Sequence, residues 1–308
     1  MPLRAAARRR RPTPPCGTSD VGFLSTGIRR STLGFFTMTT DLHTAFSSTG
    51  PNDVRRTVEL IRISALRSLK VRYRGSALGV LWSFANPVLM TAVYTLVFGT
   101  SFSKYYDGSI VRYVLSAFVG LVVVTFFLAG TTESLTSIVS SGGLLNKIAI
   151  PPAVFPLASV AANVFQQGVT TFPIMLVLAA VVTHDPVRVM LVPVVLVTVI
   201  ALTVGFGLAL ASLYVFFRDL PHLWAISGFI LWLTSPLFYP SEMTPDRVRA
   251  WIGINPIGIE ISAMREVVLH TGPVNAGAIG AAVVASGLAL VVGVLIFRAM
   301  RRDFMDLL

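Results

Sequence analysis

The sequence predicts an all-α integral membrane protein with six transmembrane helices. Hydrophobic residues make up 54% of the 308 residues and charged residues only 13%, and the mean hydropathy is +0.75. A soluble domain carries about 25% charged residues, and a globular core cannot hide this much apolar surface. Six stretches of the chain carry no charge, each long enough to cross a bilayer. These observations exclude an ordinary soluble enzyme, a disordered protein and a disulfide scaffold.

The net charge of +11 fits a membrane protein better than a nucleic-acid binder. Basic residues accumulate on the cytoplasmic side of membrane proteins, so we expect no nucleic-acid partner. Cys16 is the single cysteine, which leaves no intramolecular disulfide and no cysteine metal cluster. The four histidines are scattered without a helical i, i+4 pair, so we expect no metal site.

Residues 1–50 differ from the rest of the chain in composition. They contain an arginine run, Arg8 to Arg11, then a proline-rich stretch, and no apolar segment typical of a signal peptide. This tail is a disordered cytosolic extension, or residues 1–37 are an over-extended reading frame and Met38 is the physiological start. We favour the second alternative. The transmembrane domain is expected over 51–308.

A basic amphipathic helix is predicted at 54–74, ahead of the first span. Its apolar stripe comprises Val54, Val58, Ile61, Ala65 and Leu69. Its polar side comprises Arg56, Glu59, Arg67, Lys70 and Arg74. Arg72 intrudes on the apolar stripe. Such a helix lies along a membrane surface, and it serves either as positively charged decoration or as a platform for a cytosolic partner.

The charge-free stretches predict spans near 80–101, 113–134, 154–182, 189–216, 221–238 and 275–297. With the N-terminus inside, cytosolic segments outside the tail hold 12 cations and outer segments hold 6. This bias predicts that both termini lie in the cytosol.

Two segments between the spans are predicted to form structure of their own. Within the cytosolic linker 134–153, Ser140 to Gly143 and the Pro151-Pro152 pair are expected to break the helix. Between them, Leu144 to Ile148 forms either a short rigid peg or an ordinary loop. The outer segment 239–274 is too polar to span, and its prolines and Asn255-Pro256 predict a re-entrant helical hairpin. Glu260, Arg265 and Glu266 are then expected to face a cavity or the outer headgroups.

The sequence holds no catalytic motif of its own. It has neither a Gly-x-x-x-x-Gly-Lys-Ser/Thr phosphate loop nor a Gly-x-Ser-x-Gly elbow. Glu133, near the inner end of the second span, is either a proton relay or, as we favour, an interfacial capping residue or one that pairs with a neighbouring loop. Because the later spans carry no charge at their centres, energy for active transport has to come from elsewhere, or the protein is passive.

Five motifs in order resemble ABC-2 type permeases of the branch that exports O-antigen polysaccharide, teichoic acid and related lipid-linked glycans. The first joins Arg72-Tyr73-Arg74-Gly75-Ser76, Leu78-Gly79-Val80-Leu81-Trp82 and Asn86-Pro87. The others are Leu144-Leu145-Asn146-Lys147 with Pro151 and Pro156-Leu157-Ala158, then Phe217-Arg218-Asp219, Ser235-Pro236-Leu237-Phe238-Tyr239-Pro240 and Asn255-Pro256. The sequence departs from the family at Ile148 to Pro152, where an aromatic-proline step is common.

The resemblance implies a homodimer in the bacterial plasma membrane, with two copies of a separate ABC ATPase beneath it. ATP and magnesium would then be bound by the partner, and this chain would need no cofactor. The segment Leu144, Leu145, Asn146, Lys147 and Ile148 would dock in the ATPase. An outer gate is expected at Pro236, Tyr239, Pro240, Asn255 and Pro256. The substrate would be a polyprenyl-diphosphate-linked glycan.

Sugar rings stack on aromatic side chains, so we expect aromatic residues to line the glycan path. The candidates are Trp82, Tyr94, Phe98, Phe102, Tyr105, Tyr106, Phe126 and Phe127. Their alternative role is an interfacial belt or a lipid-facing surface. Arg72 and Arg74 are expected to meet the diphosphate at the cytosolic entrance or to anchor headgroups. The rival functions are an ABC-2 exporter of drugs or lipids and a non-transporting membrane scaffold or passive channel.

Overall fold

The structure is a computed structural model that describes residues 54–75, 79–106, 108–145, 150–237, 239, 253–301 and 304. Every regular element within these ranges is helical, which confirms the predicted all-α class. The long helices are α3 (Trp82–Phe102), α4 (Ile110–Ser140), α6 (Val154–Thr183), α7 (Pro186–Phe216) and α11 (Ala276–Met300). The shorter ones are α2 (Val54–Arg72), α5 (Gly142–Leu145), α8 (Leu220–Thr234) and α10 (Pro256–Leu269), with 3-10 turns η1 (Gly79–Leu81) and η2 (Ser103–Tyr105).

The five long helices are long and apolar enough to cross a membrane, so the chain is a multi-pass membrane protein. They begin and end close to five of the predicted spans. The remaining predicted span, 221–238, appears as α8, which has 15 residues and a length of about 22 Å. Pro236 explains the early end, because it disfavours helical backbone at Ser235, whose ψ is 138°. The six-span count itself stays a prediction.

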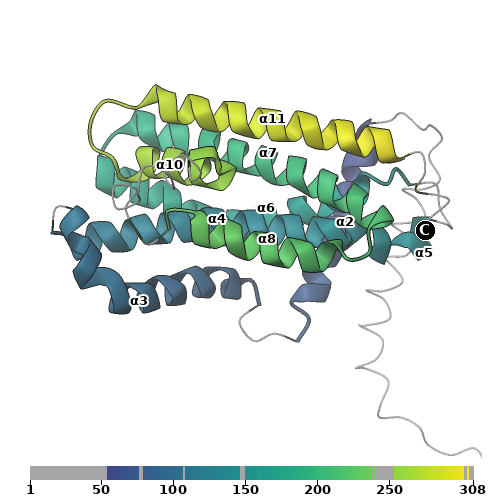
Figure 1. Cartoon of the computed structure of the whole chain (residues 1–308), viewed down its shortest axis with the longest axis horizontal. Coiled ribbons are helices and arrows are strands. Elements are labelled where there is room, and N and C mark those ends of the chain that lie inside the picture. The colour runs from purple at the N-terminus through teal and green to yellow at the C-terminus, as the bar shows by residue number, and fades with distance from the viewer. Residues whose placement is uncertain are drawn as a thin grey trace, which may run out of the picture. The chain divides into compact units, whose positions relative to one another are not determined.

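Helix α4 is central, with α3, α6, α7, α8 and α10 packed around it. Figure 1 shows the long helices side by side, with α11 along α7 and α10 at the end of the bundle where α11 begins. The core joins α4, α6, α7 and α10 through residues such as Phe127, Met175, Leu202 and Ile261. The region most enclosed in protein therefore lies at the end that carries α10.

Helix starts follow a repeated local pattern of a side-chain cap and then proline. The Asp185 carboxylate accepts from the Val187 amide at 2.9 Å, and Pro186 opens α7. The Asn255 side-chain oxygen accepts from the Ile257 amide at 3.0 Å, and Pro256 opens α10. Proline at the first helical position lacks a donor that would have no partner there. The predicted turn at Asn255-Pro256 is therefore the start of α10.

Helices α7 and α11 touch backbone to backbone at two glycines. A Cβ atom built on Gly293 would lie 2.8 Å from Gly205 Cα and closer still to the Gly205 carbonyl oxygen. A Cβ built on Gly205 would lie 2.7 Å from the Leu290 amide nitrogen. Small residues permit such close packing of membrane helices.

The amphipathic helix is confirmed as α2, but its apolar stripe differs from the predicted one. Val58 is 58% exposed, whereas Leu60 is 4% exposed. Ala65 and Leu69 pack against Ala162 of α6, as predicted for a buried face. The stripe is displaced because α2 lies against α6 rather than against a flat surface.

The break after α4 is narrower than predicted. Ser140 is the last residue of α4, and Gly142 and Gly143 open α5 instead of breaking the helix. Only Ser141 separates the two helices. Pro151 and Pro152 do precede the start of α6 at Val154, as predicted.

Candidate functional site

The side chain of Arg72, the last residue of α2, extends toward helices α4 and α6. One guanidinium nitrogen forms an ion pair with the Glu133 carboxylate of α4, and another donates to the Gln166 side-chain oxygen of α6 at 2.9 Å. The side chains of Arg72 and Glu133 are 30% and 27% exposed. Arg72 thus joins three helices at a place that water still reaches.

This arginine lies where it does because it continues the buried face of α2. Arg72 follows Leu69 by three residues, which places both side chains on one side of the helix. Arg72, the cation that interrupts the predicted apolar stripe, is therefore the residue through which α2 contacts α4 and α6. Glu133 takes the pairing role that we favoured, although its partner is on α2.

A polar cavity of about 230 Å³ surrounds the Arg72–Glu133 pair. Hydroxyl groups dominate its lining, which includes Ser64, Ser68, Thr136, Ser137, Ser140, Ser141 and Ser159. Several of these hydroxyls donate to carbonyls of their own helix, as Ser137 does to Ser134 at 2.6 Å. Their oxygens remain able to accept a hydrogen bond from a ligand or water.

Helix α6 carries a row of buried amide and hydroxyl side chains that were not predicted as site residues, because they bear no charge. Asn163 donates to the Phe126 carbonyl at 2.8 Å, and Thr170 hydrogen-bonds Ser83 of α3 at 3.1 Å. Gln167 and Thr171 are hydrogen-bonded to each other. The signal in the sequence is the run Gln166-Gln167 and Thr170-Thr171 within an otherwise apolar span.

We predict that the Arg72–Glu133 pair holds α2 against the bundle. Replacing either Arg72 by Gln or Glu133 by Gln should increase cleavage by added protease within α2 in membrane vesicles. A double-mutant cycle on Arg72 and Glu133 should give a coupling free energy of about 1 kcal/mol between the two side chains, because the pair is partly solvated. Arg67→Gln, at an exposed position of the same helix, is the control and should leave cleavage unchanged. Equal effects of Arg72→Gln and Arg67→Gln would contradict the prediction.

Three of the candidate aromatic residues of α3 form a continuous stack. Tyr94 stacks on Phe98 and Phe98 on Phe102, with ring centroids 6.1 and 5.5 Å apart. The stack continues to Trp232 of α8 at one end and to Tyr113 of α4 at the other. Trp82 opens α3 and is 52% exposed. The Tyr106 ring lies edge-on to Tyr113 at 5.7 Å, and Tyr105, 42% exposed, ends η2.

The two candidate aromatics of α4 lie elsewhere. Phe126 and Phe127 are 0% exposed and belong to the core. Phe126 contacts Phe172 of α6, and Phe127 contacts Phe206 and Trp224. In this arrangement of the chain their rings pack helices together.

The expected ATPase-docking segment and outer gate are described in part. Leu144 and Leu145 are in α5, and Asn146, Lys147 and Ile148 lie outside the described residues. Pro240 also lies outside them, and Pro236 is buried. The Tyr239 hydroxyl donates to the Thr234 carbonyl at 3.0 Å, and Asn255 donates to the Ser235 hydroxyl at 3.1 Å. The Asn255 contact joins the end of α8 to the start of α10. Arg74, expected beside Arg72 at the entrance, is exposed.

Three charged side chains among the described residues at the α10 end are buried. Arg188, one of the six cations counted in the outer segments, is 1% exposed and lies in the first turn of α7. It donates to the carbonyls of Glu266 and Gly272, the latter at 2.6 Å. The Glu266 carboxylate lies 3.7 Å from the same guanidinium. Glu260, expected to face a cavity or headgroups, is instead 0% exposed and accepts from Thr198 at 2.7 Å.

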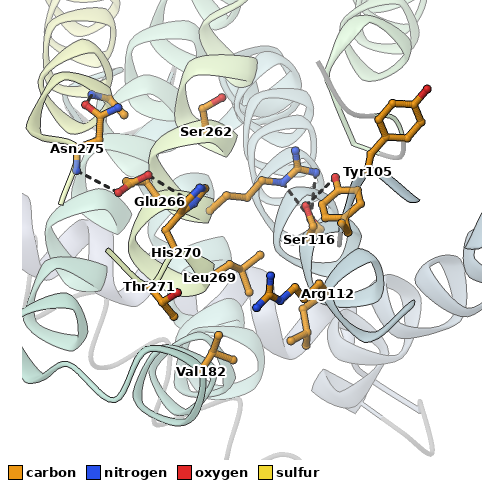
Figure 2. Close-up of a pocket in the computed structure, with 14 residues that line it drawn as sticks. Tyr105, Arg112, Ser116, Val182, Ser262, Glu266, Leu269, His270, Thr271 and Asn275 are labelled. Carbon is orange, nitrogen blue, oxygen red and sulfur yellow. Dashed lines mark hydrogen bonds and ion pairs between the residues drawn. The ribbon is translucent and has the colours of Figure 1, made fainter. Parts of the chain in front are cut away.

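The other two predicted cavity residues do line a cavity, which we call the α10 cavity. It has a volume of about 680 Å³ and lies between α10, η2 and the neighbouring ends of α4, α6 and α11. Arg265 and Glu266 are both in its lining, together with Tyr105, Arg112, Ser262 and His270. Figure 2 shows Glu266 linked to Asn275 and His270 on one side, and Ser116 linked to its neighbours on the other.

Among the described residues, no three His, Cys, Asp or Glu side chains gather in a way that could hold a metal ion.

Comparison with known proteins gives a consistent family match. Residues 59–269 match the family described as ABC-2 type transporter. Two proteins of Klebsiella pneumoniae, each called O-antigen export system permease protein RfbA, are 27% and 28% identical over 255 residues, covering 81% of this chain and 95% of the relative. The protein of the same name from Myxococcus xanthus is 34% identical over 196 residues, covering 62% of this chain and 73% of the relative.

Proposed function

The chain belongs to the ABC-2 type transporter family, and from this premise we propose that it is the permease of an ATP-driven exporter of a polyprenyl-diphosphate-linked polysaccharide. The observation that carries the proposal is the match to O-antigen export permeases over 95% of their length. The motifs around Arg72, Leu144 and Asn255 lie in the order typical of that branch. The sugar could be that of an O-antigen, a teichoic acid or a galactan-like glycan.

The energy would come from a separate ATPase subunit, present in two copies. The sequence has no phosphate loop, which supports a division of labour between two kinds of subunit. We place the docking surface at Leu144 to Ile148, with α2 beside it. In this proposal the chain lies in the inner membrane of a bacterial cell, with both termini in the cytosol.

A homodimer would form the translocation path between its two subunits. Exposed apolar residues on α3 and α8, among them Leu96 at 88% and Phe229 at 63%, support contact with a second copy or with lipid. The stacked aromatics of α3 would offer faces to sugar rings along this path. Arg72 and Arg74 would meet the diphosphate at the cytosolic side, with Arg72 exchanging Glu133 for phosphate.

Depletion of the chain in its own cell tests the export function. Full-length polyprenyl-diphosphate glycan should build up, and it should be reached by an added lectin only in inside-out vesicles. Re-expression of the chain should remove the build-up, which controls for general envelope damage. An unchanged glycan pool with normal envelope glycan would reject glycan export and favour an exporter of drugs or lipids. Purification without any ATPase subunit would favour a scaffold or passive channel.

A further inference from the structure

Two adjacent residues of α10, Arg265 and Glu266, bring opposite charges to the lining of the α10 cavity. Arg265 donates to the Ser116 carbonyl of α4 at 3.1 and 3.2 Å and to the Leu237 carbonyl at 2.9 Å. Glu266 accepts from the Asn275 amide at the start of α11 at 3.0 Å, and its carboxylate lies 3.7 Å from Arg188, which is outside the lining. Arg112 and His270 also line the cavity. These contacts hold the Arg265 and Glu266 side chains in place.

The remaining lining mixes aromatic, apolar and hydroxyl groups. Tyr105 and Tyr106 lie at the end of η2, and the apolar part consists of Leu115, Val182, Leu269 and Ala278. Ser262 and Thr271 add hydroxyls from α10 and the loop after it. Cavities of about 300–1,000 Å³ with apolar walls and a few convergent polar groups are typical of small-ligand sites. A volume of about 680 Å³ falls within this range.

The combination selects the chemistry of the ligand. An inorganic anion would meet the Glu266 carboxylate as well as the arginines, and an acyl chain would displace water from the polar lining without replacing its hydrogen bonds. A sugar ring has an apolar C–H face and a rim of hydroxyls, each of which both donates and accepts. An arginine donor and a glutamate acceptor in one lining match both capacities of such hydroxyls.

The geometry points to the α10 cavity as a saccharide-binding subsite within one subunit, separate from a path between subunits. The choice of a saccharide among neutral polyols rests on the proposed export of a glycan. On the predicted topology the cavity opens on the outer side, where it would hold one sugar unit of the emerging chain. Binding of that sugar unit would oppose movement of the glycan back toward the cytosol between cycles of ATP hydrolysis.

Ligand-observed NMR on the full chain in nanodiscs tests this subsite. The probes are the methyl glycosides of galactose, mannose, rhamnose and N-acetylglucosamine, with inorganic phosphate as the anionic comparison. We expect saturation transfer to at least one glycoside. Ser262→Trp should abolish it, because Ser262 is exposed on the cavity side of α10 and a tryptophan there fills the space. Ser262→Ala keeps the cavity open and should retain the signal.

Thr271→Trp fills the same cavity from the loop and replaces Ser262→Trp if that variant is poorly folded. Absence of glycoside binding, or binding that both tryptophan variants leave unchanged, would overturn the subsite. Binding of phosphate in place of the glycosides would overturn its assignment to a saccharide. Because binding is measured without transport, each of these results leaves the depletion test of export function unaffected.

Discussion

Replacing Gly293 by alanine is expected to destabilise the folded chain by about 3 kcal/mol or more. The added Cβ would overlap the backbone of Gly205, and a backbone cannot turn aside as a flexible side chain does. Helices α7 and α11 would have to separate along their shared length. Thermal unfolding in detergent, followed by loss of native fluorescence, measures the effect. Gly205→Ala should behave in the same way, because its Cβ meets Ala289 and Leu290 of α11.

Gly287→Ala provides the matched control on the same helix. Nothing lies within 4 Å of a Cβ built at Gly287, so this change adds helix propensity without a clash. Its unfolding midpoint should stay level or rise. If Gly287→Ala and Gly293→Ala lowered the midpoint equally, loss of glycine would matter generally and the close contact would not explain the effect.

Arg188→Met should have the second large effect, about 3–5 kcal/mol of lost stability. The side chain is 1% exposed, and its removal leaves the carbonyls of Glu266 and Gly272 and the Glu266 carboxylate without their buried partner. The loop between α10 and α11 should loosen first, since Gly272 lies within it. Hydrogen exchange of residues 270–275 and the unfolding midpoint give the local and the global measure.

A second substitution separates charge from packing at Arg188. Adding Glu266→Gln to Arg188→Met removes the stranded carboxylate, so part of the lost stability should return. Arg298→Met, at an exposed position near the end of α11, is the control and should be nearly neutral. A double variant that is less stable than Arg188→Met would show that the Glu266 charge is compensated by other groups.

Helix positions were predictable because charge-free length and capping residues are local properties of the chain. Asn255-Pro256 and the start at Val154 are examples. The partner of each helix was not predictable, because it depends on which surfaces meet. Val58 and Leu60 show this, since both are apolar and only contact with α6 decides which is buried. The closeness of Gly205 and Gly293 is likewise a property of two helices far apart in the sequence.

The charged residues of the candidate sites were predicted unevenly. Arg72 was recognisable as a cation on an apolar stripe, and Arg265 and Glu266 as polar residues of a hairpin. Arg188 was counted only as a charge of the outer segments, and its burial, with the Gly272 carbonyl of the loop after α10 as a partner, depends on contacts between distant parts of the chain. The amide side chains of α6, including Asn163 and Gln166, were not predicted, because they are uncharged and the expectations rested on ionisable groups.

Helix α4 differs from its long neighbours in having no internal proline. Pro87, Pro173 and Pro193 interrupt the hydrogen-bond ladders of α3, α6 and α7. Glu133 of the Arg72 contact and Ser116 of the α10 cavity lie 17 residues apart on α4, about 26 Å along its axis. The Arg72–Glu133 contact and the α10 cavity are therefore connected by a single helix whose hydrogen-bond ladder no proline interrupts.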